Sequence, residues 1–188
     1  ARRFGSRKEK LPRRIVFIAF TAEELGLIGS ARYVKEPLFP LDKTIAMFNM
    51  DMVGRLQEDK LTLFGTGTSS RWKDQVEELA KQHRFKLTQK PEGFGPSDHS
   101  SFYAKKIPVL HFFTGNHRDY HRPSDDLDNI NFYVMELFLD MLEQMVIRTA
   151  TTSERPDYLE TKSPATAARA GRRPEFGSSH DVGRGRPG

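Results

Sequence analysis

Short hydrophobic runs alternate with amphipathic segments along the first 150 residues of the chain. Continuous apolar runs at residues 14–20 and 44–50 predict two strands that are buried on both faces. The alternating run at 60–64 predicts a third strand, and two shorter runs, 85–88 and 109–113, predict two more.

Amphipathic spacing places helices between these strands. We expect helices at about 29–35, 71–83 and 131–148, and a brief one at 98–105. Pro37 favours an end to the first helix just before it, and Ser70 is a candidate N-cap for the second. Because strands and helices alternate, the sequence predicts an α/β fold with a mostly parallel sheet.

Composition divides the chain into three parts. Residues 1–13 form a basic lead segment, residues 14–150 hold the folded domain, and residues 151–188 have almost no large apolar side chains. A segment of that composition buries too little surface to offset its ordering entropy, so we expect 151–188 to be a disordered linker or tail.

The net charge of +5 comes from the two ends of the chain. Residues 1–14 carry seven Lys and Arg against one Glu, whereas residues 15–150 carry sixteen against nineteen Asp and Glu. A slightly acidic central part argues against a nucleic-acid partner. The sequence has no cysteine and no apolar run near the roughly 20 residues needed to span a bilayer.

Polar side chains gather where the predicted strands end. Glu23 and Glu24 follow the first strand and Asp51 ends the second, while Asp98, His117 and His121 lie in loops around the last. In an open α/β sheet, ligands bind at the carboxyl ends of strands. Carboxylates and imidazoles are the ligands that zinc uses when cysteine is absent. Their joint placement indicates a metal site.

Four motifs in this order resemble the co-catalytic di-zinc exopeptidases, a family that includes bacterial leucyl-type aminopeptidases. They are FTAEELGLIGS at 20–30, NMDMVG at 49–54, SDHSSFY at 97–103 and DYHRPSD at 119–125. The resemblance covers residues 14 to 148. It implies a three-layer α/β/α sandwich, of which residues 14–150 form the C-terminal part of the catalytic domain, with strands before Arg14 missing from this chain.

By this resemblance, Glu23 is the general base, Glu24 and His121 bind one zinc ion, and Asp51 binds the other. The implied activity is hydrolysis of N-terminal residues from peptide substrates, through a water that two zinc ions activate. Asp98 could contact substrate, support the site from behind, or cap the short helix that begins there. Tyr120 could donate a hydrogen bond to the oxyanion or serve only in packing.

The chain departs from the family pattern before Glu23. The family has an upstream His-x-Asp motif and a Gly-x-Asp-Asp-like segment, but no histidine precedes Glu23 and no aspartate precedes Asp42. Three of five expected ligands are present, so we expect the parent protein to be an enzyme and this chain alone to be inactive. A secreted or periplasmic parent would need a signal peptide upstream of Ala1.

Three alternatives remain open. A glutaminyl cyclase-like transferase shares the implied fold and uses a single zinc ion, and a carboxypeptidase of the same superfamily would share most of the site. A non-catalytic truncated relative is the third alternative.

Overall fold

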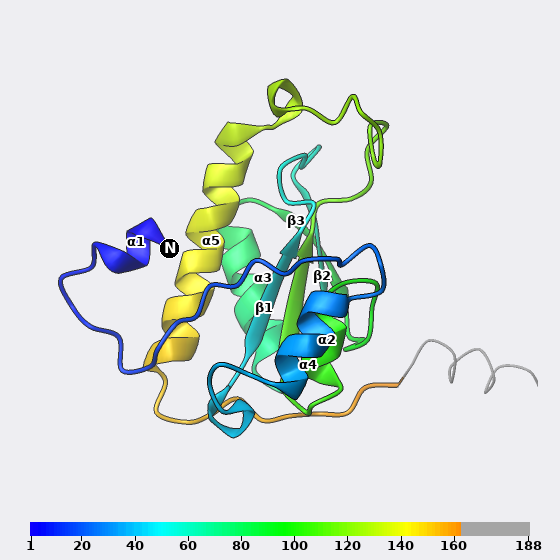
Figure 1. Ribbon diagram of the computed structural model, residues 1–188. Helices are drawn as coiled ribbons and strands as arrows, with labels where there is room; N and C mark the ends of the chain where they lie inside the picture. Colours follow the sequence, from blue (N-terminus) through cyan, green and yellow to red (C-terminus); the bar gives the residue numbers. More distant parts are fainter. Residues whose placement is uncertain (163–188) are drawn as a thin grey trace, which may run out of the picture.

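The computed structural model of the chain describes residues 1–162, which form a sheet with helices on both of its faces (Figure 1). The strands are β1 (Met47–Asp51), β2 (Lys60–Phe64), β3 (Lys86–Lys90) and β4 (Val109–Phe113). The α-helices are α1 (Arg2–Gly5), α2 (Ile28–Lys35), α3 (Trp72–Gln82), α4 (His99–Tyr103) and α5 (Phe132–Thr151). Two short 3-10 helices cover Leu41–Lys43 and Leu127–Asn129.

The four strands are arranged in the order β1-β4-β2-β3. β1 pairs in parallel with β4, and β2 pairs in parallel with β3. The central pair, β4 and β2, is antiparallel. The sheet is therefore mixed but mostly parallel, which confirms the predicted fold class. The carboxyl ends of β1 and β4 lie side by side, with Asp51 opposite Phe113.

Helices α3 and α5 cover one face of the sheet, and α2 and α4 cover the other (Figure 1). Strand β4 shows how the alternation of side chains serves both layers. Leu110 and Phe112 join the core under α3 and α5, where the rings of Phe112 and Phe138 are 5.5 Å apart. Val109 packs in the smaller core, and His111 stacks on His99 of α4. The three-layer sandwich is thus present.

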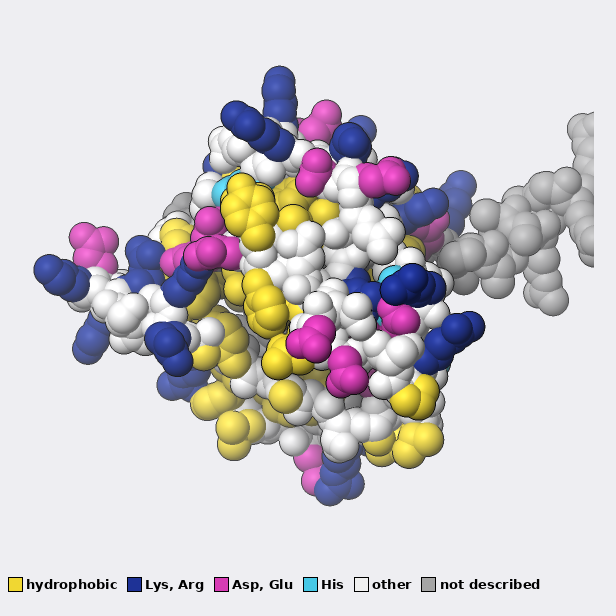
Figure 2. Space-filling view, turned by 90° about the horizontal axis from the view of Figure 1, so that it is seen from above, with side chains coloured by type: hydrophobic (Ala, Val, Ile, Leu, Met, Phe, Trp, Pro, Cys, Tyr) yellow, Lys and Arg dark blue, Asp and Glu magenta, His cyan; other side chains and the backbone are white. Residues whose placement is uncertain are grey.

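Residues 14–20 do not form the strand that their apolar run predicts. Among the described residues this segment pairs with no strand, and it crosses the molecule without regular structure (Figure 1). Val16, Phe17 and Ile18 are 42%, 51% and 41% exposed. A buried strand needs hydrogen-bonding neighbours in a sheet, and in this structure the segment joins neither edge of the four-stranded sheet. Seen from above, hydrophobic side chains lie exposed between acidic and basic ones (Figure 2).

Residues 152–162, which composition assigned to a disordered tail, lie against the folded body in the structure. Asp157 accepts hydrogen bonds from the Ser69 hydroxyl (2.7 Å) and from the backbone N–H of Ser70 (3.0 Å). The N–H of Leu159 donates to the Thr68 carbonyl at 2.8 Å. The tail predicted from residue 151 therefore begins too early, because Asp157, Tyr158 and Leu159 contact the folded body. Residues 163–188 of that tail lie outside the described part of the chain.

The start of α3 differs from the prediction, and the start of α5 has a side-chain cap. Ser70 does not cap α3, because its hydroxyl donates to Asp157 at 2.9 Å and the helix begins at Trp72. Helix α5 is capped by Asn131, whose side chain accepts from the N–H of Val134 at 3.2 Å. Within residues 1–162, no helix is long and apolar enough to cross a membrane.

Candidate active site

A tight turn presents Glu23 and Glu24 between the apolar segment 14–20 and helix α2. The N–H groups of Gly26 and Leu27 both donate to the Glu23 carbonyl, at 3.0 and 2.9 Å. Gly29 is required at the base of this turn, since a Cβ there would lie 2.5 Å from the Thr21 carbonyl oxygen. The close approach of α2 to the turn fixes the backbone position of the two glutamates.

Asp51 ends β1 and begins the second segment of the site. The next residue, Met52, has a left-handed backbone with φ of 53°, which turns the chain away from the sheet. The Thr114 hydroxyl donates to the Met52 carbonyl and ties this turn to the end of β4. Asp51 is thereby held at the carboxyl end of the sheet.

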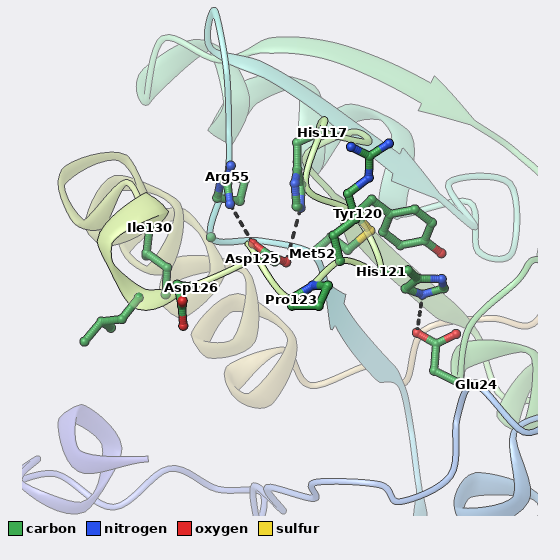
Figure 3. Close-up of a pocket in the computed structure, with 13 residues that line it drawn as sticks. Glu24, Met52, Arg55, His117, Tyr120, His121, Pro123, Asp125, Asp126 and Ile130 are labelled. Atoms are coloured by element: carbon green, nitrogen blue, oxygen red, sulfur yellow. Dashed lines mark hydrogen bonds and ion pairs between the residues drawn. The ribbon is translucent and has the colours of Figure 1, made fainter.

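The third segment is the loop that follows β4 and carries Tyr120 and His121. His121 Nε2 lies 2.7 Å from Glu24 Oε1, across 97 positions of sequence (Figure 3). The Tyr120 ring stacks on the His121 ring with centroids 3.8 Å apart. The structure thus brings together the two residues that the motifs assign to one metal ion.

A cavity of about 290 Å³ lies between these segments. Glu23, Glu24, Asp51, His111 and Tyr120 are among its lining residues. Burial raises the pKa of the Glu23 carboxyl, and the nearby carboxylates of Asp51 and Glu24 raise it further. A carboxyl in such surroundings holds a proton more readily than an exposed glutamate does, as a general base must.

Asp98 lies behind this cavity and is 8% exposed. Burial raises the pKa of its carboxyl. Although Asp98 stands at the N-terminus of α4, its side chain makes no capping hydrogen bond, and Oδ1 has no partner among the described residues. The capping role is therefore excluded, which leaves contact with substrate or support of the site.

A buried polar network adjoins Asp98. Asn49 Nδ2 donates to the Ser97 hydroxyl at 2.8 Å and lies 3.0 Å from His111 Nδ1. The His111 ring stacks on His99 at 4.5 Å with an interplanar angle of 9°. This network connects the interior of the sheet to the wall of the cavity.

The pattern of peptidase family M28 matches residues 1–146. The chain belongs to peptidase family M28. The family match spans all four motifs that resemble zinc exopeptidases, together with the segments that carry Glu23, Asp51 and His121.

Several relatives share this M28 fold. Aminopeptidase YwaD of Bacillus subtilis is 29% identical over 82% of this chain and 36% of its own length. The LapA aminopeptidase of Legionella pneumophila is 25% identical, with a TM-score of 0.67 over 79% of this chain and 42% of LapA. BSAP, a zinc aminopeptidase from Bacillus subtilis, is 28% identical, with a TM-score of 0.60 over 76% of this chain and 38% of BSAP. The M28 chain thus spans about two fifths of these relatives.

The donors in this M28 chain fit zinc in kind. Glu24 and His121 offer one carboxylate and one imidazole at a single point, and Asp51 offers another carboxylate beside them. A zinc site normally has three or four protein ligands. No group of three His, Asp or Glu side chains in residues 1–162 is arranged to hold a metal ion. These residues therefore fit as part of a zinc site.

The role of Arg55 at the candidate site was not anticipated from the sequence. Arg55 binds Asp119 and Asp125, which stand on either side of Tyr120 and His121. Its contact with Asp125 is drawn in Figure 3. The only signal in the sequence is position. Asp119 and Asp125 are the first and last residues of the DYHRPSD motif, and Arg55 follows NMDMVG directly.

Proposed function

We propose that this chain carries the water-activating part of a zinc-dependent aminopeptidase site. The supporting observation is that Glu23, Glu24 and Asp51 line one cavity, and that His121, from a third segment far apart in the sequence, contacts Glu24 at its edge. The relatives YwaD, LapA and BSAP are aminopeptidases by name, which supports this proposal over a cyclase or a carboxypeptidase.

In the proposed mechanism, Glu23 takes a proton from the attacking water and passes it to the leaving amine. Its raised pKa suits this exchange, because a carboxylate with a very low pKa would hold the proton too weakly. Glu24 and His121 would hold one zinc ion and Asp51 a second. When bound, zinc lowers the pKa of a coordinated water and stabilises the oxyanion.

The remaining residues have supporting roles in this proposal. The Tyr120 hydroxyl is a candidate donor to the oxyanion, since Tyr120 lines the same cavity as Glu23. Burial and the neighbouring carboxylates raise the pKa of Tyr120, so its hydroxyl keeps its proton. The charge of the Asp98 carboxylate would help to keep the pKa of Glu23 raised.

The test compares two isosteric substitutions in the zinc-loaded parent protein. Glu23→Gln should lower kcat by about 10²- to 10⁴-fold, the usual contribution of a general base, while zinc content stays near normal. Glu24→Gln should lose zinc, because it removes a ligand of one ion. The measurements are zinc stoichiometry and hydrolysis of leucine p-nitroanilide.

Glu36→Gln is the matched control. It makes the same chemical change on an exposed residue that directly follows α2 and pairs with Arg32. It should leave both zinc content and turnover unchanged. Near-normal turnover in Glu23→Gln would contradict the assignment of the base.

A further inference from the structure

One guanidinium binds both ends of the loop that carries Tyr120 and His121. Arg55 Nη2 donates to Asp119 Oδ2 at 2.7 Å, and Arg55 Nη1 donates to Asp125 Oδ1 at 2.6 Å. Asp119 precedes Tyr120 directly, and Asp125 lies four residues after His121. The two ion pairs therefore close the loop on itself around a single side chain of another segment. Figure 3 shows the pair between Arg55 and Asp125.

The Arg55–Asp119 contact is sheltered from solvent. The side chains of Arg55 and Asp119 are 13% and 10% exposed. Asp119 Oδ1 also accepts a hydrogen bond from the Ser124 hydroxyl at 2.9 Å. The two carboxylate oxygens of Asp119 therefore have separate donors.

The loop needs such support because its backbone is strained at His121. His121 has a φ of 56°, a left-handed conformation that costs a non-glycine residue free energy unless its surroundings impose it. The turn is closed by a hydrogen bond from the N–H of Arg122 to the Asp119 carbonyl at 2.9 Å. Asp119, which accepts hydrogen bonds from Arg55 and from the Ser124 hydroxyl, therefore anchors that turn.

Arg55 is itself firmly placed. It follows Asp51 by four residues, and the carbonyl of its neighbour Gly54 accepts a hydrogen bond from the N–H of Asn131 at 2.9 Å. Arg55 therefore connects the segment that ends β1 to the loop that carries His121.

We propose that Arg55 is a positioning residue that holds His121 against Glu24 by clamping the loop 119–125 at both ends. The planar guanidinium is suited to this task because its donors point to two carboxylates at once, which a lysine ammonium does not reproduce. Any effect of Arg55 on catalysis rests on the proposed function. The positioning of His121 by Arg55 does not depend on it.

The experiment uses the full chain without metal or substrate, so its outcome is independent of the aminopeptidase proposal. Arg55→Met removes the clamp, Arg55→Lys keeps only the charge, and Asp125→Asn removes one charge at the more exposed end. The matched control is Arg148→Met, because Arg148 makes two 2.9 Å contacts with Glu78 far from this loop.

Two measurements report on the loop. Amide hydrogen exchange of peptides covering 117–125 should speed up at least about ten-fold in Arg55→Met, an opening cost of about 1.4 kcal/mol, with Arg55→Lys close behind. The long-range ¹H–¹⁵N spectrum of the histidine rings should show one tautomer for His121 in the parent chain and averaged tautomers in Arg55→Met. Arg148→Met should change neither.

Unchanged exchange in 117–125, or an unchanged His121 ring spectrum in Arg55→Met, would overturn the proposal. So would faster exchange spread evenly over the sheet, since that would mean only a general loss of stability. If Arg55→Met fails to fold, Asp125→Asn decides, because partial averaging of the His121 tautomers is expected there and its absence would overturn the proposal.

Discussion

At the scale of single residues, His99 and His111 form a buried pair beside the candidate site. His99 is fully buried, and neither of its ring nitrogens has a partner among the described residues. Burial lowers the pKa of His99 to about 3 and that of His111 to about 4. Both rings are therefore neutral at physiological pH, and the core does not accommodate their protonated forms.

This pair predicts acid sensitivity of the fold. In the unfolded chain both histidines titrate near 6.5, so below that pH the unfolded state binds more protons than the folded state. The free energy of unfolding should then fall by several kcal/mol as the pH drops from about 6.5 to about 4, at up to roughly 1.4 kcal/mol per pH unit for each histidine. His99→Phe should flatten this slope, measured by urea denaturation at several pH values.

His83→Gln serves as the control for that experiment, since it leaves the buried pair intact and should keep the parent slope. An equally steep fall in stability in His99→Phe would show that other groups cause the acid sensitivity. The absolute stability of His99→Phe is not the readout, because a larger ring in this site adds its own packing cost.

Residue chemistry explains which site residues can be found from the sequence. Glu23, Glu24 and His121 stand in motifs whose residue types already suggest metal chemistry, and the structure brings Glu24 and His121 together. Arg55 has no such signal, because a surface arginine and a clamp look alike in the sequence. Its partner Asp119 is 64 positions away, and only the parallel pairing of β1 with β4 brings their segments together.

At the scale of elements, the segment 152–162 is a strap along the body. Besides the contacts of Asp157 and Leu159, the N–H of Thr161 donates to the Tyr103 hydroxyl at 2.7 Å. The rings of Tyr158 and Tyr103 lie 5.4 Å apart. These contacts link the strap to α4 and to the start of α3.

Truncation should separate the strap from the rest of the predicted tail. A chain ending at residue 162 should unfold at the same temperature as the full chain. A chain ending at 151 should unfold at a lower temperature, because it loses several hydrogen bonds worth about 1 kcal/mol each and the packing of Tyr158. Thermal unfolding followed by circular dichroism measures the difference. Equal midpoints for all three chains would show that the strap contributes nothing to stability.

Elements with local signals were predictable, and those that depend on distant partners were not. Strand β4 and helix α2 lie within a residue of their predicted bounds, because apolar runs and Pro37 mark them locally. The segment 14–20 has an equally strong local signal but joins neither edge of the sheet. The strap has a weak local signal, yet it is held by partners more than 50 positions away.

At the scale of the whole molecule, the chain covers about two fifths of the relatives that it matches. Its zinc donors, Glu24, His121 and Asp51, are too few for two complete sites. Its exposed apolar residues Val16, Phe17 and Ile18 lie on a segment without strand neighbours.

The 188-residue chain alone should therefore bind zinc weakly and hydrolyse no substrate. With two protein ligands at one point and one at the other, affinity should be far below that of a three- or four-ligand site. Zinc and cobalt binding is measured by calorimetry, and turnover is measured with leucine p-nitroanilide. Submicromolar binding of two metal ions with measurable turnover would show that unrecognised ligands complete the site.

The short distance in sequence between Asp51 and Arg55 has an evolutionary consequence. Asp51 faces the cavity while Arg55 holds the loop opposite, so both tasks depend on the length and the path of one short segment. A one-residue insertion between Asp51 and Arg55 would displace one of these side chains while the other kept its position. Selection should therefore remove such length variants. The neighbouring turn at Gln57–Lys60 is exposed and holds no site residue, so lineages of this family are free to lengthen it.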